Sequence, residues 1–369
     1  MLKKSIKKNL AEYNKNNIHL GTLGGHSALD IALGARKQGL KTVVICQKGR
    51  ERTYNQYYKN LFDEIILVDK FAELTSSKIV KKLQKLKTVF VQSRYSWVYC
   101  NYSEIEKKFP IPIFGVRGLV RREERDANRN QYYLMKKADI RHPKIFKKPQ
   151  KINKLVLVKV AEATRKHERA FFIAENYQDY QKKSQQLLEQ GLIDEESLGK
   201  AVIEEFILGA SFNFNFFYSP LKKRLELLGV DTRRASNIDG LTNLPAPEQF
   251  KILEYLKPQY VEAGHLACTV KESVLEKAFI LGEKLVKVLR AEFPSGMIGP
   301  FALQTMLTPG PPKEELVTFD LSLRMPGSPG TIFTPYSHYL FERPVSVGER
   351  IAMEVREALE SGALEQIVT

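Results

Sequence analysis

The chain has 369 residues, of which 43% are hydrophobic and 27% charged, and these proportions are ordinary for a globular protein of two or three domains. It contains no apolar run of about 18 residues, and no apolar segment follows its basic start, so we expect neither a membrane-spanning helix nor a signal peptide. Three widely separated cysteines match no zinc spacing or disulfide framework. We therefore expect a cytoplasmic protein without membrane contacts.

The net charge of +16 favours an anionic partner, either a nucleic acid or a phosphorylated small molecule. Lysines are spread from Lys3 to Lys313 and form no single cluster interleaved with aromatic residues. Such dispersal is typical of solvated basic faces rather than of a nucleic-acid surface. We expect a small-molecule anion as the partner and no nucleic acid.

The first third of the chain alternates short apolar runs with amphipathic stretches. Because helices separate the strands, this pattern predicts a parallel, doubly wound α/β sheet. A connector with two prolines, 140–150, marks its end. The predicted strands are 17–24, 41–47, 64–69, 87–93 and 111–115, and the predicted helices are 26–39, 54–61, 78–86 and 121–138.

The remainder predicts an α+β unit of antiparallel strands with helices. Strands 154–160 and 170–176 are expected to form a hairpin with a charged tip. Along 211–221 the side chains alternate, so that Asn213 and Asn215 face away from the phenylalanines between them. Further strands are predicted at 201–208, 224–233, 298–307 and 314–325, and helices at 177–190, 275–293 and 347–362.

A glycine turn, Gly24–Gly25, follows the first predicted strand and opens a helix. Free backbone N–H groups and the helix dipole make such a turn a natural anion site. His26 and Ser27 would then lie within reach of a phosphate or a ribose. The alternative is that Ser27 only caps the helix and His26 is an exposed turn residue.

Lys159 lies on the first strand of the predicted hairpin, where an ammonium group can bind nucleotide phosphates. The alternative is a surface lysine on an edge strand, and Lys144 is a weaker case of the same kind. Glu204 and Glu205 end a strand that leads into a glycine, which suits a hinge whose backbone binds adenine. An ordinary pair of capping or salt-bridging acids is the alternative there.

Oxygen-bearing side chains lie on two late strands, which contain Gln304 and Asp320. Asp320, Ser322 and Arg324 are two residues apart and share one face of their strand. The oxygens suit Mg²⁺, and the guanidinium could bind a phosphoryl group through two hydrogen bonds. The alternative is a polar strand face in water.

A loop that ends in glycine is predicted after the strand 224–233. Arg233, Asn237 and Asp239 crowd this loop and could line a site. The segment Asn-Ile-Asp-Gly is equally consistent with simple turn chemistry.

Taken together, several segments resemble the archaeal formate-dependent 5-formaminoimidazole-4-carboxamide ribotide synthetase family, from about Ile18 to the C-terminus. The segments that carry the resemblance are, in order, TLGGHSALDIALGA, FGVRG, IEEFILG, NFFYSPLK, LELLGVDTR, SNIDGL, IGPFALQ and PVSVGERIA. The resemblance implies a Rossmann-like N-terminal domain, 1–140, followed by an ATP-grasp domain with a small subdomain or lid, 141–208, and a large subdomain, 209–369.

The resemblance also implies an activity. Members of the family convert aminoimidazole carboxamide ribotide, formate and ATP into the formylated ribotide, ADP and phosphate, with Mg²⁺ or alternatively Mn²⁺. They tend to assemble as homo-oligomers, trimers or hexamers. By analogy we expect a carbon–nitrogen ligase of purine biosynthesis, whose partners are the ribotide and formate.

Matched residue by residue, the family pattern assigns roles to the candidates above. It implies that Lys159 and Arg324 are catalytic, and that Gln304 and Asp320 bind metal where relatives usually carry glutamates. The ATP-binding positions implied are Lys144, Lys159, Glu204, Glu205 and Ile207, and the substrate-binding positions are His26, Ser27, Arg117, Arg233, Asn237 and Asp239.

Three loops depart from the family pattern. The family's glycine-rich phosphate loop is replaced by AEATRKHERAFF, which has no glycine and in which Thr164, Arg165, Lys166 and Arg169 could supply cationic or hydroxyl donors instead. The segment VQSRYSWVY stands where a Pro-His-Gly-Ser motif is expected, and LRMPGSPG where Gly-Thr-Asn is expected. The first hypothesis is a formylating ligase with a variant loop. The alternatives are a paralogue acting on a different acid or amine and a non-catalytic ribotide- or nucleotide-binding protein.

Overall fold

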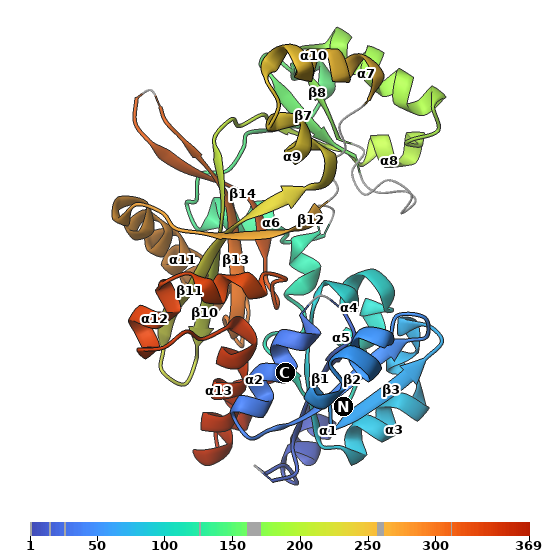
Figure 1. The fold of residues 1–369 in the computed structure, drawn as a ribbon, viewed down its shortest axis with the longest axis vertical. Coiled ribbons are helices and arrows are strands. Elements are labelled where there is room, and N and C mark those ends of the chain that lie inside the picture. The colour runs from blue at the N-terminus through green and yellow to red at the C-terminus, as the bar shows by residue number, and fades with distance from the viewer. Residues whose placement is uncertain are drawn as a thin grey trace.

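The computed structural model describes residues 2–14, 16–25, 27–124, 127–160, 171–256, 262–310 and 312–369. Its strands form a five-stranded parallel sheet, a four-stranded sheet and a five-stranded antiparallel sheet. Figure 1 shows the parallel sheet at one end of the molecule, the four-stranded sheet at the other end and the antiparallel sheet between them. The predicted combination of α/β and α+β parts is confirmed.

The parallel sheet has the order β3-β2-β1-β4-β5. Neighbouring strands run the same way, as in the pairs His19 with Lys41 and Phe90 with Ile113. The strand order reverses between β1 and β4, and a doubly wound sheet binds its ligand at the carboxyl ends of such strands. The strands are β1 (His19–Leu23), β2 (Lys41–Gln47), β3 (Glu64–Val68), β4 (Thr88–Val91) and β5 (Ile113–Phe114).

Helices accompany this sheet, and one of the predicted helices is wrong. Residues 121–138 form no single helix, because Arg129 has a left-handed backbone (φ 52°) and Asn130 caps a new helix. The helical stretch predicted around 54–61 is present as a π-helix, Thr53–Tyr57, followed by a 3₁₀ helix, Lys59–Leu61. The helices of this part are α1 (Leu2–Leu10), α2 (Ala28–Lys37), α3 (Ser77–Lys85), α4 (Arg94–Tyr99) and α5 (Tyr102–Lys107). The next helix, α6 (Gln131–Lys137), packs with the antiparallel sheet instead.

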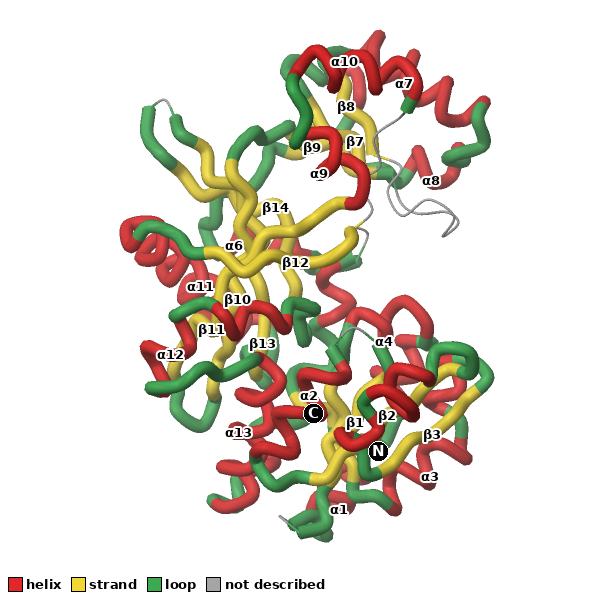
Figure 2. The backbone as a smooth tube through the Cα atoms, in the orientation of Figure 1, coloured by secondary structure: helices red, strands yellow, loops and turns green. Residues whose placement is uncertain are grey.

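The four-stranded sheet has the order β6-β9-β7-β8, and its strands are antiparallel neighbours. The predicted hairpin is therefore confirmed as β7 and β8, whereas its tip lies outside the described residues. Two helices, α7 and α8, accompany the sheet (Figure 2). The elements are β6 (Ile145–Phe146), β7 (Val156–Lys159), β8 (Phe171–Ala174), α7 (Tyr177–Glu189), α8 (Glu195–Gly199) and β9 (Val202–Glu205).

The antiparallel sheet has the order β12-β11-β10-β13-β14. One face, which includes Phe214 and Phe216, packs against apolar residues of α11. The opposite face carries the polar Asn213 and Asn215, whereas Phe217 further along β10 belongs to a second apolar cluster. Residues 236–242 form a helix, so the predicted loop is wrong there. The elements are β10 (Ala210–Ser219), β11 (Arg224–Ala235), α9 (Ser236–Thr242), α10 (Ala246–Tyr255), β12 (Glu262–Cys268), α11 (Glu272–Glu292), β13 (Gly299–Thr308) and β14 (Glu315–Ser322).

The C-terminal segment returns to the N-terminal sheet. It contains α12 (Tyr336–Phe341) and α13 (Val347–Glu360), and α13 packs against α2 (Figure 1). Thr369 exchanges two backbone hydrogen bonds with Ile113, of 3.0 and 2.8 Å. The three-part division at 140 and 208 stays a prediction, and this last segment packs with the first part.

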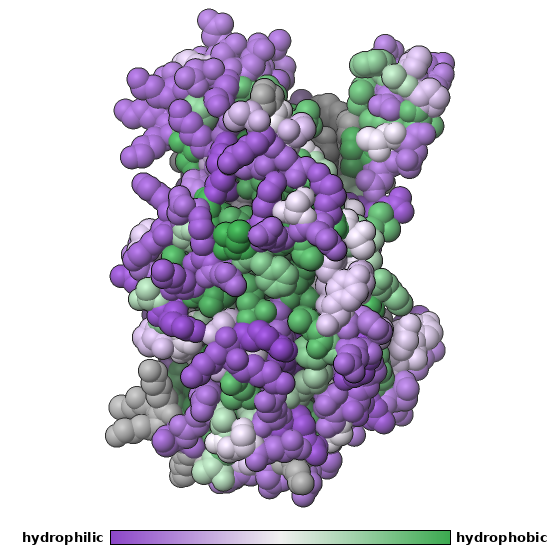
Figure 3. All heavy atoms as spheres, turned by 90° about the vertical axis from the view of Figure 1, so that its left-hand side faces the viewer, coloured by the Kyte–Doolittle hydropathy of each residue, from purple (hydrophilic) through white to green (hydrophobic). Residues whose placement is uncertain are grey.

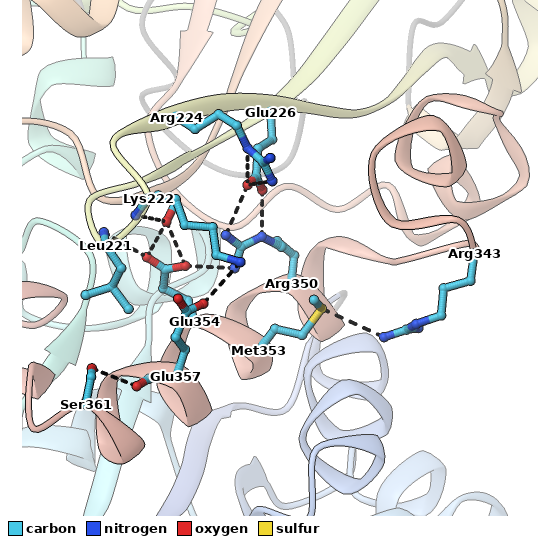
Figure 4. A network of polar contacts seen from close by, with 11 residues as sticks. Leu221, Lys222, Arg224, Glu226, Arg343, Arg350, Met353, Glu354, Glu357 and Ser361 are labelled. Atoms are coloured by element: carbon cyan, nitrogen blue, oxygen red, sulfur yellow. Dashed lines mark hydrogen bonds and ion pairs between the residues drawn. The ribbon is translucent and has the colours of Figure 1, made fainter.

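A buried ion network fixes α13 to the antiparallel sheet (Figure 4). The Arg350 guanidinium binds Glu226 of β11 through Nε, at 2.6 Å, and Glu354 through Nη1, at 2.8 Å. It also lies 4.4 Å from the centre of the Phe217 ring. All three charged side chains are at most 1% exposed, so the network is part of the core.

The outer surface is mostly polar. Hydrophilic residues dominate the face drawn in Figure 3, and hydrophobic residues gather across its middle. None of the helices in the described part of the chain is long and apolar enough to span a membrane.

Candidate functional site

Lys159 joins the four-stranded sheet to the antiparallel sheet. It lies at the end of β7, where its ammonium forms an ion pair with Glu204 of β9, and both side chains are buried. The Tyr132 hydroxyl donates to the same carboxylate, at 2.9 Å, and the ammonium also lies 5.7 Å from the centre of the Phe319 ring on β14. An exposed edge lysine is thereby ruled out, and the side chain reaches the strand that carries Asp320.

Glu205 points to the other side of the strand and holds the small sheet together. Its carboxylate accepts from Lys154, at 2.9 Å, and from Arg141, at 3.1 Å. Partial burial would raise the pKa of Glu205, but hydrogen bonds from Lys154, from the Lys144 backbone and from Arg141 lower it to about 2. The Lys144 side chain is exposed, and Ile207 is partly buried after the strand. Adenine binding here stays a prediction.

Gln304 and Asp320 face each other on β13 and β14, in direct register. The Gln304 amide donates to the Ser322 hydroxyl, at 3.2 Å, and its buried oxygen has no hydrogen-bond partner among the described residues. A carboxylate beside an unpartnered amide oxygen fits Mg²⁺, which keeps waters and phosphate oxygens as further ligands. In the described part of the chain no cluster of three or more His, Cys, Asp or Glu could hold a metal alone.

Asp231 is the centre of a polar network that the sequence did not reveal. Its carboxylate accepts from Asn215, at 2.6 Å, and from Asn213, at 2.9 Å, and binds the His265 ring, at 2.6 Å. The other ring nitrogen of His265 lies 2.8 Å from Glu262. The alternation of asparagine and phenylalanine in β10 was the one signal that pointed to this face.

Of the three residues predicted to line a loop after β11, where the structure has α9, two have charged partners. The Arg233 Nε lies 3.2 Å from Glu262, and Asp239 accepts from Arg234, at 3.0 Å. Arg233 faces the same side of the sheet as Asp231, two residues before it. The Asn237 side chain lies outside the described residues.

Arg324 follows β14 and is nearly buried, with 13% of its side chain exposed. Its Nε lies 3.4 Å from Glu123, whose other oxygen accepts the Leu323 N–H, at 2.8 Å. Burial lowers the pKa of Arg324, and the nearby charges of Arg94 and Arg233 add to this. Burial and nearby cations raise the free energy of the charged guanidinium, so an anion bound beside Arg324 would be stabilised by it.

The loops after β1 and β4 border the crevice where the strand order reverses. The Ser27 hydroxyl donates to the Pro326 carbonyl, at 2.8 Å, and does not cap α2. A side chain at Gly25 would meet the Tyr95 ring at 2.6 Å, so Tyr95 packs directly on the glycine turn. His26 lies outside the described residues.

Arg117 has a structural environment. Its guanidinium donates to the backbone carbonyls of Ile105, Phe109, Ile111 and Thr369, at 2.6 to 2.9 Å. Burial lowers its pKa to about 10, although Tyr102 and Glu106 oppose this. These contacts join α5, the segment that leads into β5 and the last residue. A contact between Arg117 and substrate stays a prediction.

Two further features lie beside this crevice. A cavity of about 20 Å³, room for about one water, is lined by the ends of β4, β5 and β14. On α4, Trp97 packs against Tyr102, with ring centres 5.0 Å apart, and under the Arg121 guanidinium. The cavity residues include Gln92 and Arg324.

Two family models match the chain. Residues 20–146 match a model described as a protein of unknown function (DUF1246), and residues 179–369 match a domain of unknown function (DUF1297). The chain is 37% identical to a protein of Methanopyrus kandleri over 98% of this chain and 97% of that protein. It is 36% identical to a protein of Methanocaldococcus jannaschii over 97% of each. Both are named 5-formaminoimidazole-4-carboxamide-1-(beta)-D-ribofuranosyl 5'-monophosphate synthetase.

Solved structures give the same result for the fold. The IMP biosynthesis protein PurP from Thermococcus kodakaraensis is 25% identical, with a TM-score of 0.70 over 95% of this chain and all of that chain. N5-carboxyaminoimidazole synthetase from Staphylococcus aureus is 12% identical, with a TM-score of 0.60 over 93% of this chain and 79% of that chain. The fold is that of ATP-grasp enzymes, and the chain belongs to the family of 5-formaminoimidazole-4-carboxamide ribotide synthetases.

Proposed function

We propose that this protein is an ATP-dependent, ADP-forming ligase that formylates aminoimidazole carboxamide ribotide with formate in the cytoplasm. One observation carries the proposal most directly. Buried Lys159 reaches from the small sheet to β14, where Asp320 faces Gln304. A buried lysine that reaches β14, a carboxylate on that strand and the nearly buried Arg324 just after it suit phosphoryl transfer, which depends on positioning and electrostatics.

The reaction has two steps. A formate oxygen attacks the γ-phosphorus of ATP, the bond to the β–γ bridging oxygen breaks, and ADP leaves. The ribotide amine then attacks the carbon of formyl phosphate, the carbon–oxygen bond to phosphate breaks, and the nitrogen loses a proton. Lys159 and Arg324 stabilise the negative charge on the transferring group. Mg²⁺, or Mn²⁺ in its place, bound by Asp320 and Gln304, would neutralise charge on the phosphate oxygens.

A coupled assay tests the function. ADP and the formylated ribotide should form only when ATP, Mg²⁺, formate and the aminoimidazole ribotide are all present. Lys159→Met should lower ADP formation at least about 100-fold, because it removes a cation that stabilises the transferring charge. Lys183→Met is the matched control, since Lys183 pairs with Asp179 on the surface of α7, at 2.9 Å. Unchanged turnover in Lys159→Met would refute the assignment of Lys159.

One observation favours a second candidate, a paralogue that uses a different amine. Tyr95 lies in the segment that replaces the expected Pro-His-Gly-Ser motif, and its ring packs on Gly25 in the turn where the ribotide is predicted to bind. A thermal-shift screen of phosphorylated amines distinguishes the two candidates. Stabilisation by another phosphorylated amine, but not by the aminoimidazole ribotide, would favour the paralogue. Stabilisation by the ribotide without ADP formation would favour a binding protein without catalysis.

We also expect a homo-oligomer, a trimer or a hexamer, as family members tend to form. Light scattering of the purified protein measures the molar mass and distinguishes these states from a monomer of 42.3 kDa.

A further inference from the structure

We propose that Arg94, in the N-terminal domain, binds the phosphoryl group as it passes from ATP to the acid, beside Arg324. The inference rests on the proposed function and adds a residue that the family pattern does not supply. Arg94 stands in VQSRYSWVY, the segment in which this chain departs from its relatives.

Topology brings Arg94 to the interface between the parallel and the antiparallel sheets. It is the first residue of α4, three residues after the end of β4. The carboxyl end of β4 borders the point where the strand order reverses, which is where such sheets bind ligands. Gln92, two residues before Arg94, lines the same small cavity as Arg324, so the loop before Arg94 faces the end of β14.

Arg94 and Arg324 share one carboxylate. The Arg94 Nη1 donates to Glu124, at 2.7 Å, and lies 3.7 Å from Oε2 of Glu123. The Arg324 Nε lies 3.4 Å from that same oxygen. Glu123 thus keeps the two guanidinium groups near each other, and a pair of guanidinium groups can bind one anion through several charge-assisted hydrogen bonds.

The electrostatic surroundings keep Arg94 charged. Burial would lower the pKa of this guanidinium, but Glu124, Glu123 and Asp320 outweigh burial and raise it. Asp320 is the carboxylate predicted to bind metal, so Arg94 acts at the place where the γ-phosphate would lie.

Much of the Arg94 guanidinium remains available to a ligand. Only its Nη1 takes part in a hydrogen bond with the described residues, whereas a guanidinium has five donors. Its side chain keeps 41% exposure, against 13% for Arg324. The remaining donors therefore reach solvent at the edge of the site.

Neighbouring hydroxyls also lack partners. Ser93 and Ser96 flank Arg94, are at most 4% exposed, and have side-chain oxygens without a hydrogen-bond partner among the described residues. A buried hydroxyl without a hydrogen-bond partner lowers the stability of the fold, and an anion with several oxygens can accept hydrogen bonds from such hydroxyls. This observation is independent of the charges and points to a ligand at the same loop.

A transferring phosphoryl group fits this position better than a static phosphate. Its charge spreads over three oxygens during transfer, so it needs donors from more than one side. The sequence contains no glycine at 161–172, so it lacks there the residue type that lets backbone N–H groups approach phosphate oxygens most closely and stabilise their charge. A guanidinium from the N-terminal domain replaces part of that lost stabilisation.

The first experiment compares two arginine variants. Arg94→Gln should lower kcat about 100-fold and leave KM for ATP and for the ribotide within about threefold. Arg94→Lys, which keeps the charge but loses the planar fork, should lie between wild type and Arg94→Gln. Arg121→Gln is the matched control and should keep kcat within about twofold. Arg121 likewise forms an ion pair with a glutamate, but that partner, Glu106, is not the one that Arg94 and Arg324 share.

Guanidinium rescue separates a direct role from a structural one. Added guanidinium chloride should raise kcat of Arg94→Ala at least about tenfold, while equal sodium chloride should not, because a free guanidinium can occupy the vacated place. A kcat for Arg94→Gln within about threefold of wild type would overturn the proposal. So would a loss of kcat that parallels a loss of folded protein and shows no rescue.

A binding measurement distinguishes failure of this inference from failure of the proposed function. Mg·ADP with aluminium fluoride, which mimics the transferring phosphoryl group, should raise the melting temperature of wild type more than Mg·ADP alone. Arg94→Gln should keep the Mg·ADP shift and lose the increment from aluminium fluoride. If wild type turns over but Arg94→Gln keeps the full increment, only the Arg94 inference fails. If wild type responds to neither mixture, the ATP-dependent function fails as well.

Discussion

His265 carries a positive charge that it loses only when the pH becomes alkaline. Burial would lower its pKa, but the hydrogen bonds to Asp231 and Glu262 outweigh burial and raise the pKa to about 9. The ring is therefore doubly protonated at pH 7 and donates to both carboxylates. Arg233 balances part of the negative charge through Glu262.

This raised pKa predicts how stability changes with pH. In the unfolded chain histidine titrates near 6.5, so the His265 contribution is complete below that pH and is lost as the pH rises towards about 9. Urea unfolding at pH 6, 7.5 and 9 should show a fall in the free energy of unfolding. His265→Gln should be less stable at pH 6 and show a smaller fall. An equal pH dependence in both proteins would contradict the assignment.

Single residues differed in how far the sequence could predict them. Lys159, Glu204, Gln304 and Asp320 stood on recognisable strands, and the structure brings Lys159 next to Glu204 and Gln304 opposite Asp320. Asp231 and His265 were missed, because a lone carboxylate and a lone histidine in β-strands give no local signal. Their pairing depends on the register between β11 and β12, which appears only when the sheet forms.

At the scale of elements, α13 depends on a charge network inside the core. Arg350 is held by Glu226 and Glu354, and Ser219 donates to Glu354, at 2.7 Å (Figure 4). A buried ion pair adds little by itself, but removing one partner leaves uncompensated charge in the interior. The network therefore constrains substitution more than it adds stability.

Arg350→Met should destabilise the protein by about 3–5 kcal/mol, since it leaves Glu226 and Glu354 buried without their shared cation. Urea unfolding followed by circular dichroism measures this change. Arg356→Met on the same helix removes a surface pair with Glu360 and should cost no more than about 1 kcal/mol. Similar losses in the two variants would show that burial of the Arg350 network is not decisive.

Elements were predictable where one rule dominated. The hydrophobic period placed α7 and α13 almost at their observed bounds, and the chain leaves α13 through Gly362, which has a left-handed backbone (φ 68°). The predicted helix 121–138 was wrong for two reasons. The segment is polar throughout, so no hydrophobic period shows where a helix begins or ends, and one residue with a left-handed backbone interrupts it. Local sequence does not show which residue will take that conformation.

At the scale of the whole molecule, the last helix docks on the N-terminal domain through glycines. A side chain at Gly348 would lie 2.4 Å from the Asp30 backbone, and one at Gly34 would lie 2.4 Å from the Glu349 backbone. The Gly348 N–H also donates to the Asp30 carboxylate, at 2.9 Å. The close approach of α2 and α13 therefore requires glycine on both helices.

Gly348→Ala should destabilise the protein by about 1–3 kcal/mol, because backbone rather than a flexible side chain blocks the added methyl group. The melting temperature should fall accordingly. Gly199→Ala is the control, since nothing lies within 4 Å of a side chain there and alanine favours helix at the end of α8. A Gly348→Ala protein as stable as wild type would mean that the two helices can separate without cost.

The assembly of the parts was less predictable than the parts. The alternation of strands and helices indicated the parallel sheet, and its predicted strands match β1 to β5. The return of the C-terminal segment to β5 and the shared Glu123 between Arg94 and Arg324 join residues about 200 positions or more apart. Such contacts depend on how the parts are oriented, and hydrophobic periodicity carries no information about that.

Trp97 gives the molecule an optical reporter at a useful place. It is the one tryptophan of the chain, and it lies on α4, three residues from Arg94, against Tyr102 and under Arg121. Indole emission shifts in wavelength and intensity when its polar surroundings or its stacking partners move. Binding of a nucleotide or ribotide that displaces this short helix would therefore change the intrinsic fluorescence of the protein, without any label. Stopped-flow mixing could then measure the rate of binding of each ligand.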